Sequence, residues 1–87
     1  MKAKYFGELN HLNLENNSIG DLGVINLLKS MSSVELKYLN LSKNHITNYA
    51  CGELCDYIIN DSELDEVYLY WNDIGSEGGL LIAEALK

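Results

Sequence analysis

LNHLNLENNSI, which runs from Leu9 to Ile19, returns as LKYLNLSKNHI from Leu36 and as LDEVYLYWNDI from Leu64. All three copies follow the pattern LxxLxLxxNxI, in which Val67 is the one conservative replacement. A fixed period of this size is typical of a chain built from stacked units that cannot bury their apolar faces alone. The sequence therefore predicts a repeat protein whose functional surface is created by the stacking.

The second half of each unit predicts an amphipathic helix. After the last Ile of each pattern come GDLGVINLLKSM, TNYACGELCDYI and GSEGGLLIAEAL. Small and apolar residues recur there at four-residue steps: Gly23, Leu27 and Met31; Ala50, Leu54 and Ile58; Gly78, Ile82 and Leu86. Residues four apart lie on one helical face, whereas the alternating Leu-x-Leu before them predicts a short strand. Each unit is thus a predicted strand–turn–helix.

This pattern resembles the ribonuclease-inhibitor type of leucine-rich repeat, whose units pair LxxLxLxxN with a helix over about 28 residues. The resemblance covers nearly the whole chain, in units at about residues 9–35, 36–63 and 64–87, and we interpret residues 1–8 as an N-terminal cap remnant. It implies an α/β fold with one domain at 1–87. The expected architecture is an open leucine-rich-repeat solenoid, with a short parallel sheet on the concave face and helices on the convex face.

Composition excludes several classes of partner. A net charge of −7, with six Lys and no Arg, argues against binding to nucleic acid, whose phosphates require a basic surface. No apolar run approaches the roughly 20 residues of a membrane span. The N-terminal MKAKYFGE lacks the apolar core of a signal peptide. We therefore expect a cytoplasmic protein, or one exported into a host cell without a recognisable signal peptide.

Asn17, Asn44 and Asn72 occupy the same point of each unit, just after the predicted strand. Such a ladder could bind a ligand. The structural interpretation is stronger, because a carboxamide both donates and accepts hydrogen bonds and the chain turns there. The resemblance implies the same structural role.

Cys51 and Cys55 lie four residues apart on one predicted helix, where their side chains run parallel. We expect free thiols packed as small apolar residues. Two sulfurs without neighbouring His ligands do not make a zinc site, so no metal or cofactor is predicted.

The small residues also receive structural interpretations. Gly23 and Gly78 occupy helix positions that we expect to approach the strand closely. Asp21, Asn48 and Ser76 stand where each would cap the start of its own helix.

Alternation along each strand leaves the third, fifth and seventh residues of the pattern facing out of the sheet. These are His11, Asn13 and Glu15; Tyr38, Asn40 and Ser42; and Glu66, Tyr68 and Tyr70, with Trp71 at the strand's exit. Parallel pairing places Tyr38 beside Glu66 and Asn40 beside Tyr68. Tyr and Trp are enriched in binding hot spots, although Tyr is also common in strands. The predicted partner-binding residues are Tyr38, Asn40, Glu66, Tyr68, Tyr70, Trp71, Glu15 and His11.

We predict no enzymatic activity and no catalytic residues. Glu15 and Glu66 are expected two strand spacings apart, roughly 10 Å, which is near the separation in inverting glycosidases. A shallow three-strand surface cannot exclude water from them, however. The predicted function is a protein–protein interaction module that binds an unidentified protein, with a basic surface, on an acidic aromatic face. The alternatives are a carbohydrate-binding module, or a fragment of a larger leucine-rich-repeat regulator or receptor.

The predicted third unit has no cap after it. Val67, Leu69, Ile74, Ile82 and Leu86 are expected to present one side to an open end, and Tyr5 and Phe6 to cover the other end. Terminal repeats normally need a polar outer face. A homodimer that buries the third unit would meet that need.

Overall fold

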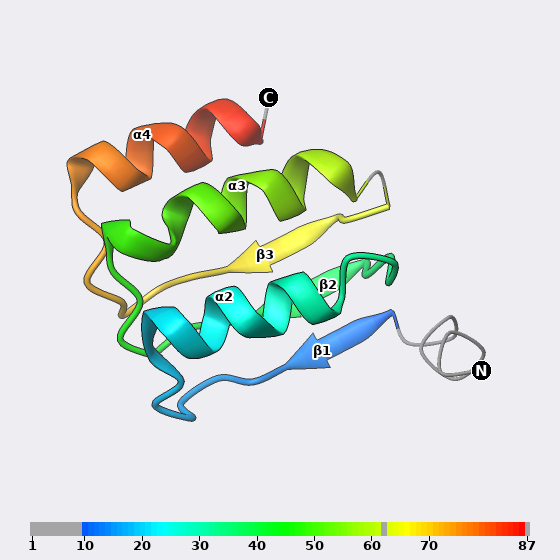
Figure 1. The fold of residues 1–87 in the computed structure, drawn as a ribbon, viewed down its shortest axis with the longest axis horizontal. Coiled ribbons are helices and arrows are strands. Elements are labelled where there is room, and N and C mark those ends of the chain that lie inside the picture. Colours follow the sequence, from blue (N-terminus) through cyan, green and yellow to red (C-terminus); the bar gives the residue numbers. More distant parts are fainter. Residues whose placement is uncertain (1–9, 62, 87) are drawn as a thin grey trace.

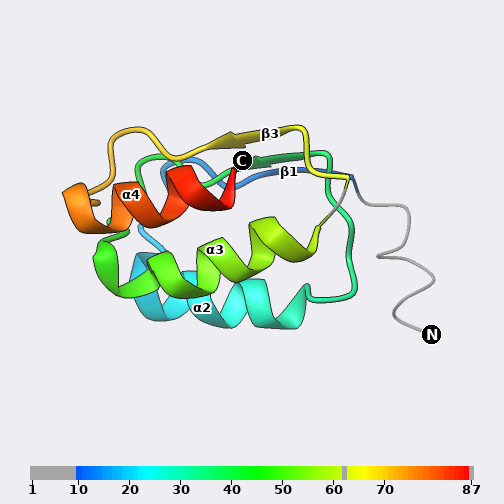
Figure 2. The same cartoon turned by 90° about the horizontal axis from the view of Figure 1, so that it is seen from above.

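Strands alternate with helices along the chain in the computed structural model, which describes residues 10–61 and 63–86. In order, the elements are β1 (His11–Asn13), α2 (Gly20–Ser30), β2 (Tyr38–Asn40), the 3-10 turn η1 (Asn48–Ala50), α3 (Cys51–Asn60), β3 (Glu66–Tyr68) and α4 (Ser76–Ala85). The strands form one layer and the helices a second (Figures 1 and 2). None of the described helices is long and apolar enough to cross a membrane. The predicted cap at 1–8, with Tyr5 and Phe6, lies outside the described residues.

The sheet is parallel, in the order β1-β2-β3. His11 pairs with Tyr38, which pairs with Glu66, and Asn40 pairs with Tyr68. The predicted α/β class, parallel sheet and register are therefore confirmed. The register follows from the constant period, because slipping by one residue would turn every Leu out of the core.

The middle unit supplies most of the core. Leu36, Leu39 and Leu41 have no exposed surface, whereas Leu12 in the first unit and Val67 in the third are only partly buried. Full burial of each such side chain is worth about 1.5–3 kcal/mol. The middle unit is buried best because it alone has a neighbour on both sides in the described chain.

One face of each helix packs towards the following unit. Cys51 and Cys55 on α3 are free and buried, which confirms that they pack as small apolar residues. Leu28 is buried at the position on α2 that corresponds to Cys55. The equivalent residues on α4, Gly79 and Ala83, are exposed. The chain's last described helix therefore leaves this face open.

Gly78 makes a close approach, but not to a strand. A Cβ atom there would collide with Asn48 Oδ1 and would lie 2.6 Å from Cys51 Sγ. A Cβ on Gly23 would meet Ile19 of its own turn. The expectation that these glycines face the strands is therefore wrong: Gly78 allows helix-layer packing between the second and third units.

The predicted helix caps also act between units. Asp21 accepts hydrogen bonds from Thr47 N (2.8 Å) and Thr47 Oγ1 (2.6 Å) in the second unit. Asn48 Oδ1 accepts from Gly78 N (3.0 Å), in the first turn of α4. Within the described chain no side chain caps α2, and Ser76 makes no capping bond to α4. The prediction that each residue caps its own helix is wrong. Asp21 and Asn48 reach the next unit instead, and Ser76 makes no capping bond.

The Asn44 carboxamide joins the turns of two units. Its Oδ1 accepts from Asn17 N (2.9 Å) and Ile19 N (3.2 Å) of the first unit. Its Nδ2 donates to the carbonyl oxygens of Leu14 (2.9 Å) and Ser42 (3.0 Å).

Asn72 repeats this arrangement one unit later. Its Oδ1 accepts from Asn44 N and Ile46 N, both at 2.9 Å, and its Nδ2 donates to the carbonyls of Leu41 and Leu69. Asn17 is exposed, and its Nδ2 donates only to carbonyls of its own unit, within the described residues. Asn44 and Asn72 thus each bind two adjacent units, whereas the Asn17 side chain binds one.

This difference predicts unequal stability losses. We expect Asn44→Ala to lower the free energy of unfolding by about 1–3 kcal/mol, because it orphans buried backbone groups in two units. Asn17→Ala is the matched control and should cost less, since its carboxamide serves exposed carbonyls. Urea denaturation of both variants measures the difference. Equal losses would contradict a role in joining units.

Burial also lowers the reactivity of the two cysteine thiols. Desolvation is the main cause that raises the pKa of both thiols, so the reactive thiolate is scarce at neutral pH. We expect a thiol-specific reagent to modify Cys51 and Cys55 far more slowly in the folded protein than in urea. Modification at the same rate in both conditions would contradict this packing.

Candidate functional site

The outward side of the sheet carries three rows of side chains. Pairing puts His11, Tyr38 and Glu66 in the first row and Asn13, Asn40 and Tyr68 in the second. Continuing the register puts Glu15, Ser42 and Tyr70 in the third. We call this surface, together with Lys43 and Trp71 at the strand exits, the sheet face. It forms the outer side of the strand layer, away from the helices (Figure 2).

Aromatic rings contact one another across the strands. The His11 and Tyr38 rings stack with centroids 3.9 Å apart and an interplanar angle of 4°. Tyr38 and Tyr68 pack at 5.4 Å with a tilt of 48°. The Tyr68 hydroxyl donates to Glu66 Oε1 at 2.6 Å. The structure therefore brings four of the predicted partner-binding residues into one contiguous group.

Glu15 connects the other predicted residues of this face. Its Oε2 accepts from the Tyr70 hydroxyl at 2.8 Å, across the intervening strand position of Ser42. Its Oε1 accepts from Asn40 Nδ2 at 3.0 Å. Lys43 Nζ lies 3.6 Å from Oε2. One carboxylate thus holds groups from the second and third units.

Asn40 and Ser42 do not face solvent as expected. Asn40 is 4% exposed and Ser42 is 0% exposed. Asn40 Oδ1 accepts from Ser42 N, and Ser42 Oγ accepts from Tyr70 N. Both side chains are covered because larger neighbours on the flanking strands close over the central one. Asn40 was predicted to contact a partner, and its observed contacts are instead internal.

Trp71 projects from the exit of the third strand. It is 79% exposed, and its backbone adopts a left-handed conformation with φ of 59°. Asn16 and Lys43, at the same repeat position, are also left-handed, so the turn geometry recurs. Lys43 Nζ lies 5.4 Å from the centre of the Trp71 ring, a cation–π contact.

Sequence reasoning missed Lys43 as part of this site. Lys43 occupies the same repeat position as Trp71, so the shared position was the available signal. The Lys43 ammonium group lies between the Glu15 carboxylate and the Trp71 ring.

Hydrogen bonds shift the pKa values on this face. The Tyr70 hydroxyl is the main cause that lowers the Glu15 pKa below its ordinary value of 4.5, with Asn40 and Lys43 adding to the effect against partial desolvation. The bond to Glu15 in turn raises the Tyr70 pKa, and the bond to Glu66 raises the Tyr68 pKa. Near neutral pH, Glu15 is therefore ionised and both phenols keep their protons.

Glu15 and Glu66 lie apart on the sheet face. Glu66 lies in the row of His11 and Tyr38, whereas Glu15 lies two rows on, so the expectation that only strand spacing separates them is wrong. Each accepts a hydrogen bond from a different Tyr. In the described part of the chain, no group of three His, Cys, Asp or Glu side chains could hold a metal ion.

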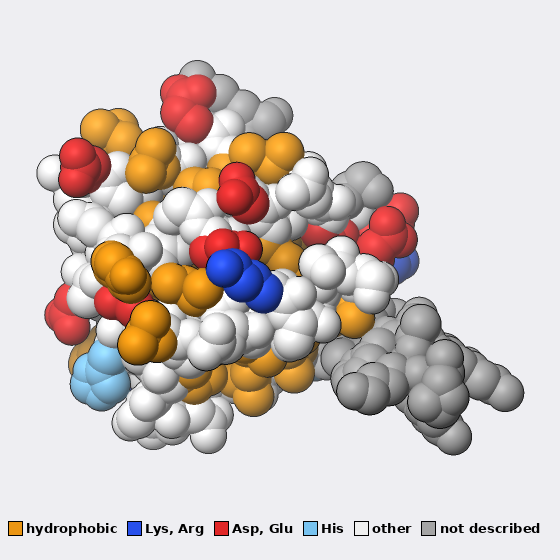
Figure 3. All heavy atoms as spheres, in the orientation of Figure 1, with side chains coloured by type: hydrophobic (Ala, Val, Ile, Leu, Met, Phe, Trp, Pro, Cys, Tyr) orange, Lys and Arg blue, Asp and Glu red, His pale blue; other side chains and the backbone are white. Residues whose placement is uncertain are grey.

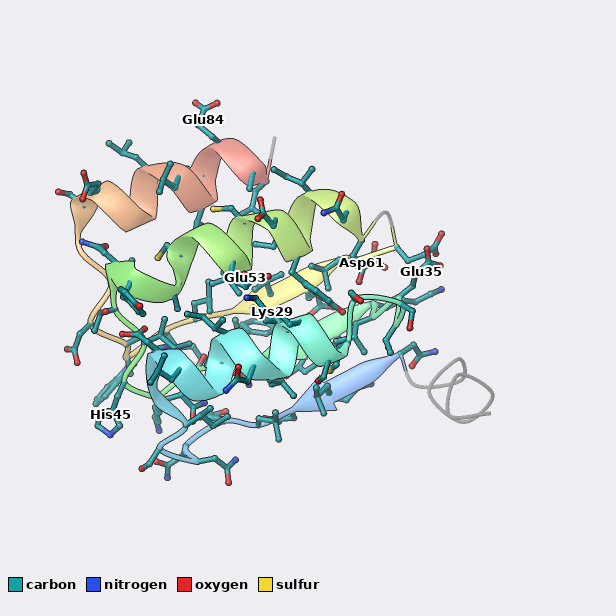
Figure 4. The ribbon with its side chains drawn as sticks, viewed as in Figure 1. Lys29, Glu35, His45, Glu53, Asp61 and Glu84 are labelled. Atoms are coloured by element: carbon teal, nitrogen blue, oxygen red, sulfur yellow. The ribbon has the colours of Figure 1, made fainter. Side chains whose placement is uncertain are left out.

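A hollow of 540 Å³ opens on the opposite, helix side, between the ends of α2 and α3. Lys29, Glu53 and Asp61 are among its lining residues, and Figure 4 shows Lys29 and Glu53 on these neighbouring helices. Asp61 Oδ2 accepts from Leu36 N at 2.8 Å, which ties this side chain to the fold. None of the predicted partner-binding residues lines this hollow.

Comparison with known proteins gives consistent matches. A family model described as "Leucine Rich repeat" matches residues 9–28, 35–55 and 64–83. The chain is 37% identical over 81 residues to human "NACHT, LRR and PYD domains-containing protein 13", covering 91% of this chain and 8% of that protein. It is 32% identical over 81 residues to protein 3 of the same series from Bos taurus, with the same coverage.

The ribonuclease inhibitor of Sus scrofa is 35% identical over 80 residues, covering 90% of this chain and 18% of the inhibitor. The chain thus spans only a small part of the length of these relatives. No solved structure gives a significant match.

The Glu15–Tyr70 contact predicts a specific titration. Because the folded-state pKa of Glu15 is lowered, its interactions contribute stability above the unfolded pKa and lose it as pH falls through the folded value. We expect Tyr70→Phe to raise the Glu15 pKa towards 4.5, as measured by NMR titration of its side-chain carboxyl. Tyr68→Phe, which removes the hydroxyl on Glu66, is the control. An unchanged Glu15 pKa in Tyr70→Phe would contradict the contact.

Proposed function

Because the chain belongs to the leucine-rich repeat proteins, a family that generally mediates protein–protein interaction, we propose that it binds a protein partner on its sheet face. The chain acts as one domain, 1–87, whose three units at about 9–35, 36–63 and 64–87 form an open solenoid. The sheet face is its concave side. The module is not an enzyme and needs no cofactor.

Trp71 is the observation that carries this proposal. A large apolar ring that is 79% exposed contributes little to the core, and a left-handed backbone is uncommon for a bulky residue. Lys43 and the neighbouring Tyr70 flank it at the same end of the sheet. Exposed Trp and Tyr side chains beside one another are typical hot-spot residues.

The hydrogen bonds of Glu15 support the same function. Tyr70 is already held by Glu15, so a partner that packs on its ring orders few further rotamers. His11, Tyr38 and Tyr68 form a second, stacked area beside it, with Glu66 at its edge. Asn40 supports this face from below rather than contacting the partner.

Charge favours a basic partner surface. The net charge of the chain is −7. Both carboxylates of the sheet face accept hydrogen bonds from neutral Tyr hydroxyls, which leave their negative charge in place. Those same contacts make carbohydrate binding the weaker alternative, because Glu15 and Glu66 are already occupied by the hydroxyls that a sugar would replace. Nucleic acid and membrane surfaces are not the proposed partners.

Two further predictions remain proposals. We place the protein in the cytoplasm, or in a host cell after export. The alternative that the chain acts within a larger leucine-rich-repeat regulator or receptor is compatible with the same sheet face, since the segments of its relatives that it matches lie in much longer proteins.

The relatives suggest a first partner to test. One is by name an inhibitor of ribonuclease, so a ribonuclease is a defined candidate alongside proteins captured from a lysate. A glycan array run in parallel tests the carbohydrate alternative. Binding to glycans without any protein partner would overturn the proposal.

For a protein partner found in this way, we expect Tyr70→Ala and Trp71→Ala each to weaken binding by about 2 kcal/mol, the size of a hot-spot loss. Titration calorimetry measures the change, and thermal unfolding checks that the fold is kept. Tyr49→Ala is the matched control, because Tyr49 is also an exposed aromatic residue but lies in η1, outside the sheet. Affinity that is unchanged by both sheet-face variants but reduced by Tyr49→Ala would place the site on the helix side.

A further inference from the structure

The sheet face already holds one cation between a carboxylate and an aromatic ring. Lys43 Nζ lies 3.6 Å from Glu15 Oε2 and 5.4 Å from the centre of the Trp71 ring. The three side chains come from three different units, so the stacking of the units creates this arrangement. A cation in such a place is stabilised by the carboxylate and by the negative face of the ring together. The chain thus contains its own example of how this face binds a positive charge.

A second carboxylate on the sheet face has aromatic rings beside it but no cation. Glu66 pairs in register with Tyr38, and its Oε1 accepts from the Tyr68 hydroxyl at 2.6 Å. Its Oε2 has no hydrogen-bond or ion-pair partner among residues 10–61 and 63–86. Lys37, which precedes Tyr38 in the chain, forms no ion pair within the same described ranges. Glu66 therefore presents an exposed negative charge beside the second unit.

The orientation of the Tyr38 ring indicates where a cation would lie. The His11 ring covers one face of Tyr38, with centroids 3.9 Å apart and planes that differ by 4°. Because His11 lies on β1, the other face of the Tyr38 ring points along the row, towards Glu66 on β3. Tyr68 meets Tyr38 at 5.4 Å with a tilt of 48°, so these two rings do not stack. The second face of Tyr38, the tilted Tyr68 ring and Glu66 Oε2 thus border one position.

The chemistry of this position favours a guanidinium group over an ammonium group. A guanidinium is flat, it stacks on aromatic rings, and its N–H donors match the oxygens of a carboxylate. An ammonium group is compact and more strongly hydrated, so it gains less from contact with rings. Tyr68 already donates to one oxygen of Glu66, which leaves Oε2 as the acceptor for a partner.

We propose that the sheet face binds an arginine side chain of its partner, with the guanidinium group against the Tyr38 and Tyr68 rings and hydrogen-bonded to Glu66 Oε2. This inference rests on the proposed function, because it names the chemistry of the partner at the same face. Glu15 takes no direct part, since both of its oxygens already accept hydrogen bonds within the protein. The site lies between the second and third units, across the register pair of Tyr38 and Glu66.

A short peptide tests this site without a known partner. The probe is acetyl-Gly-Arg-Gly-amide. Two control peptides replace its arginine with lysine, or with citrulline, which has the shape of arginine without the charge. In NMR titrations, we expect the arginine peptide to shift the ring signals of Tyr38 and Tyr68 and the side-chain carboxyl signal of Glu66. The lysine peptide should cause smaller shifts at the same concentration, and the citrulline peptide should cause none.

Two glutamate variants separate this site from a general attraction to an acidic protein. Glu66→Gln keeps an acceptor for the Tyr68 hydroxyl but removes the charge, and it should weaken binding of the arginine peptide about fivefold, the upper range for an exposed ion pair. Figure 3 shows acidic side chains on the helix side as well, so a matched control is required there. Glu53→Gln makes the same charge change on α3 and should leave binding unchanged.

Tyr38→Ala tests the aromatic part of the site. It should weaken binding of the arginine peptide by about two- to fivefold, the range for a cation–π contact at an exposed position. Thermal unfolding checks that each variant keeps the fold. If Tyr38→Ala or Glu66→Gln does not fold, the comparison of the arginine and citrulline peptides on the parent protein carries the test.

Three results would overturn the proposal. The first is equal binding of the arginine and citrulline peptides, and the second is an equal loss of binding in Glu66→Gln and Glu53→Gln. The third is a set of shifts confined to α2 and α3, which would assign the arginine to the hollow on the helix side.

The outcome is separate from that of the proposed function. If Tyr70→Ala and Trp71→Ala weaken a protein partner while Glu66→Gln does not, the sheet face remains the binding surface and the arginine site is wrong. If the arginine peptide binds as expected but no protein partner depends on Tyr70 or Trp71, the arginine site stands and the proposed function fails.

Discussion

The carboxamide after each strand is the interaction on which the rest of the structure depends. Asn44 and Asn72 each accept two backbone N–H bonds from the unit before and donate to carbonyls in both units. These groups lie in tight turns where no regular secondary structure could satisfy them. The turns therefore stay in register with one another, and with them the strands that precede the turns. The left-handed residues at Asn16, Lys43 and Trp71 are a direct result of that shared turn geometry.

The sheet face depends on this register. Glu15 can accept from Tyr70 only because a parallel, in-register sheet puts them in one row with small Ser42 between them. A larger residue at position 42 would separate the two side chains and expose Tyr70 further. Because Tyr70, Asn40 and Lys43 contact the Glu15 carboxylate, the negative charge of this face is less exposed to solvent than the net charge of the chain suggests. The sheet face is mainly aromatic, with charge at its margins.

How much the sequence predicts follows from what a repeat pattern contains. The period places equivalent residues opposite one another, so the pairs Tyr38–Glu66 and Asn40–Tyr68 could be predicted. The period does not indicate which side chains extend into a neighbouring unit. Asp21 and Asn48 look like caps of their own helices, yet they bind backbone groups one unit later.

Burial within the sheet face was unpredictable for a related reason. Alternation identifies Asn40 and Ser42 as outward-facing, and their backbones do alternate in that way. Their exposure depends on the sizes of neighbouring residues, which are Glu15 and Tyr70 on the two flanking strand segments and Tyr38 on their own strand. Lys43 illustrates the converse, because a residue in the turn rather than the strand completes the face.

The two ends of the stack differ in what they leave unsatisfied. In the third unit, Asn72 N and Ile74 N occupy the positions whose counterparts, Asn44 N and Ile46 N, donate to a following carboxamide. In the first unit, the Asn17 side chain keeps its acceptor oxygen without a partner among the described residues. Donors thus predominate at one end of the turn ladder and an acceptor at the other. The hydrogen bonds between units therefore have a direction, because each carboxamide oxygen accepts from the unit before its own.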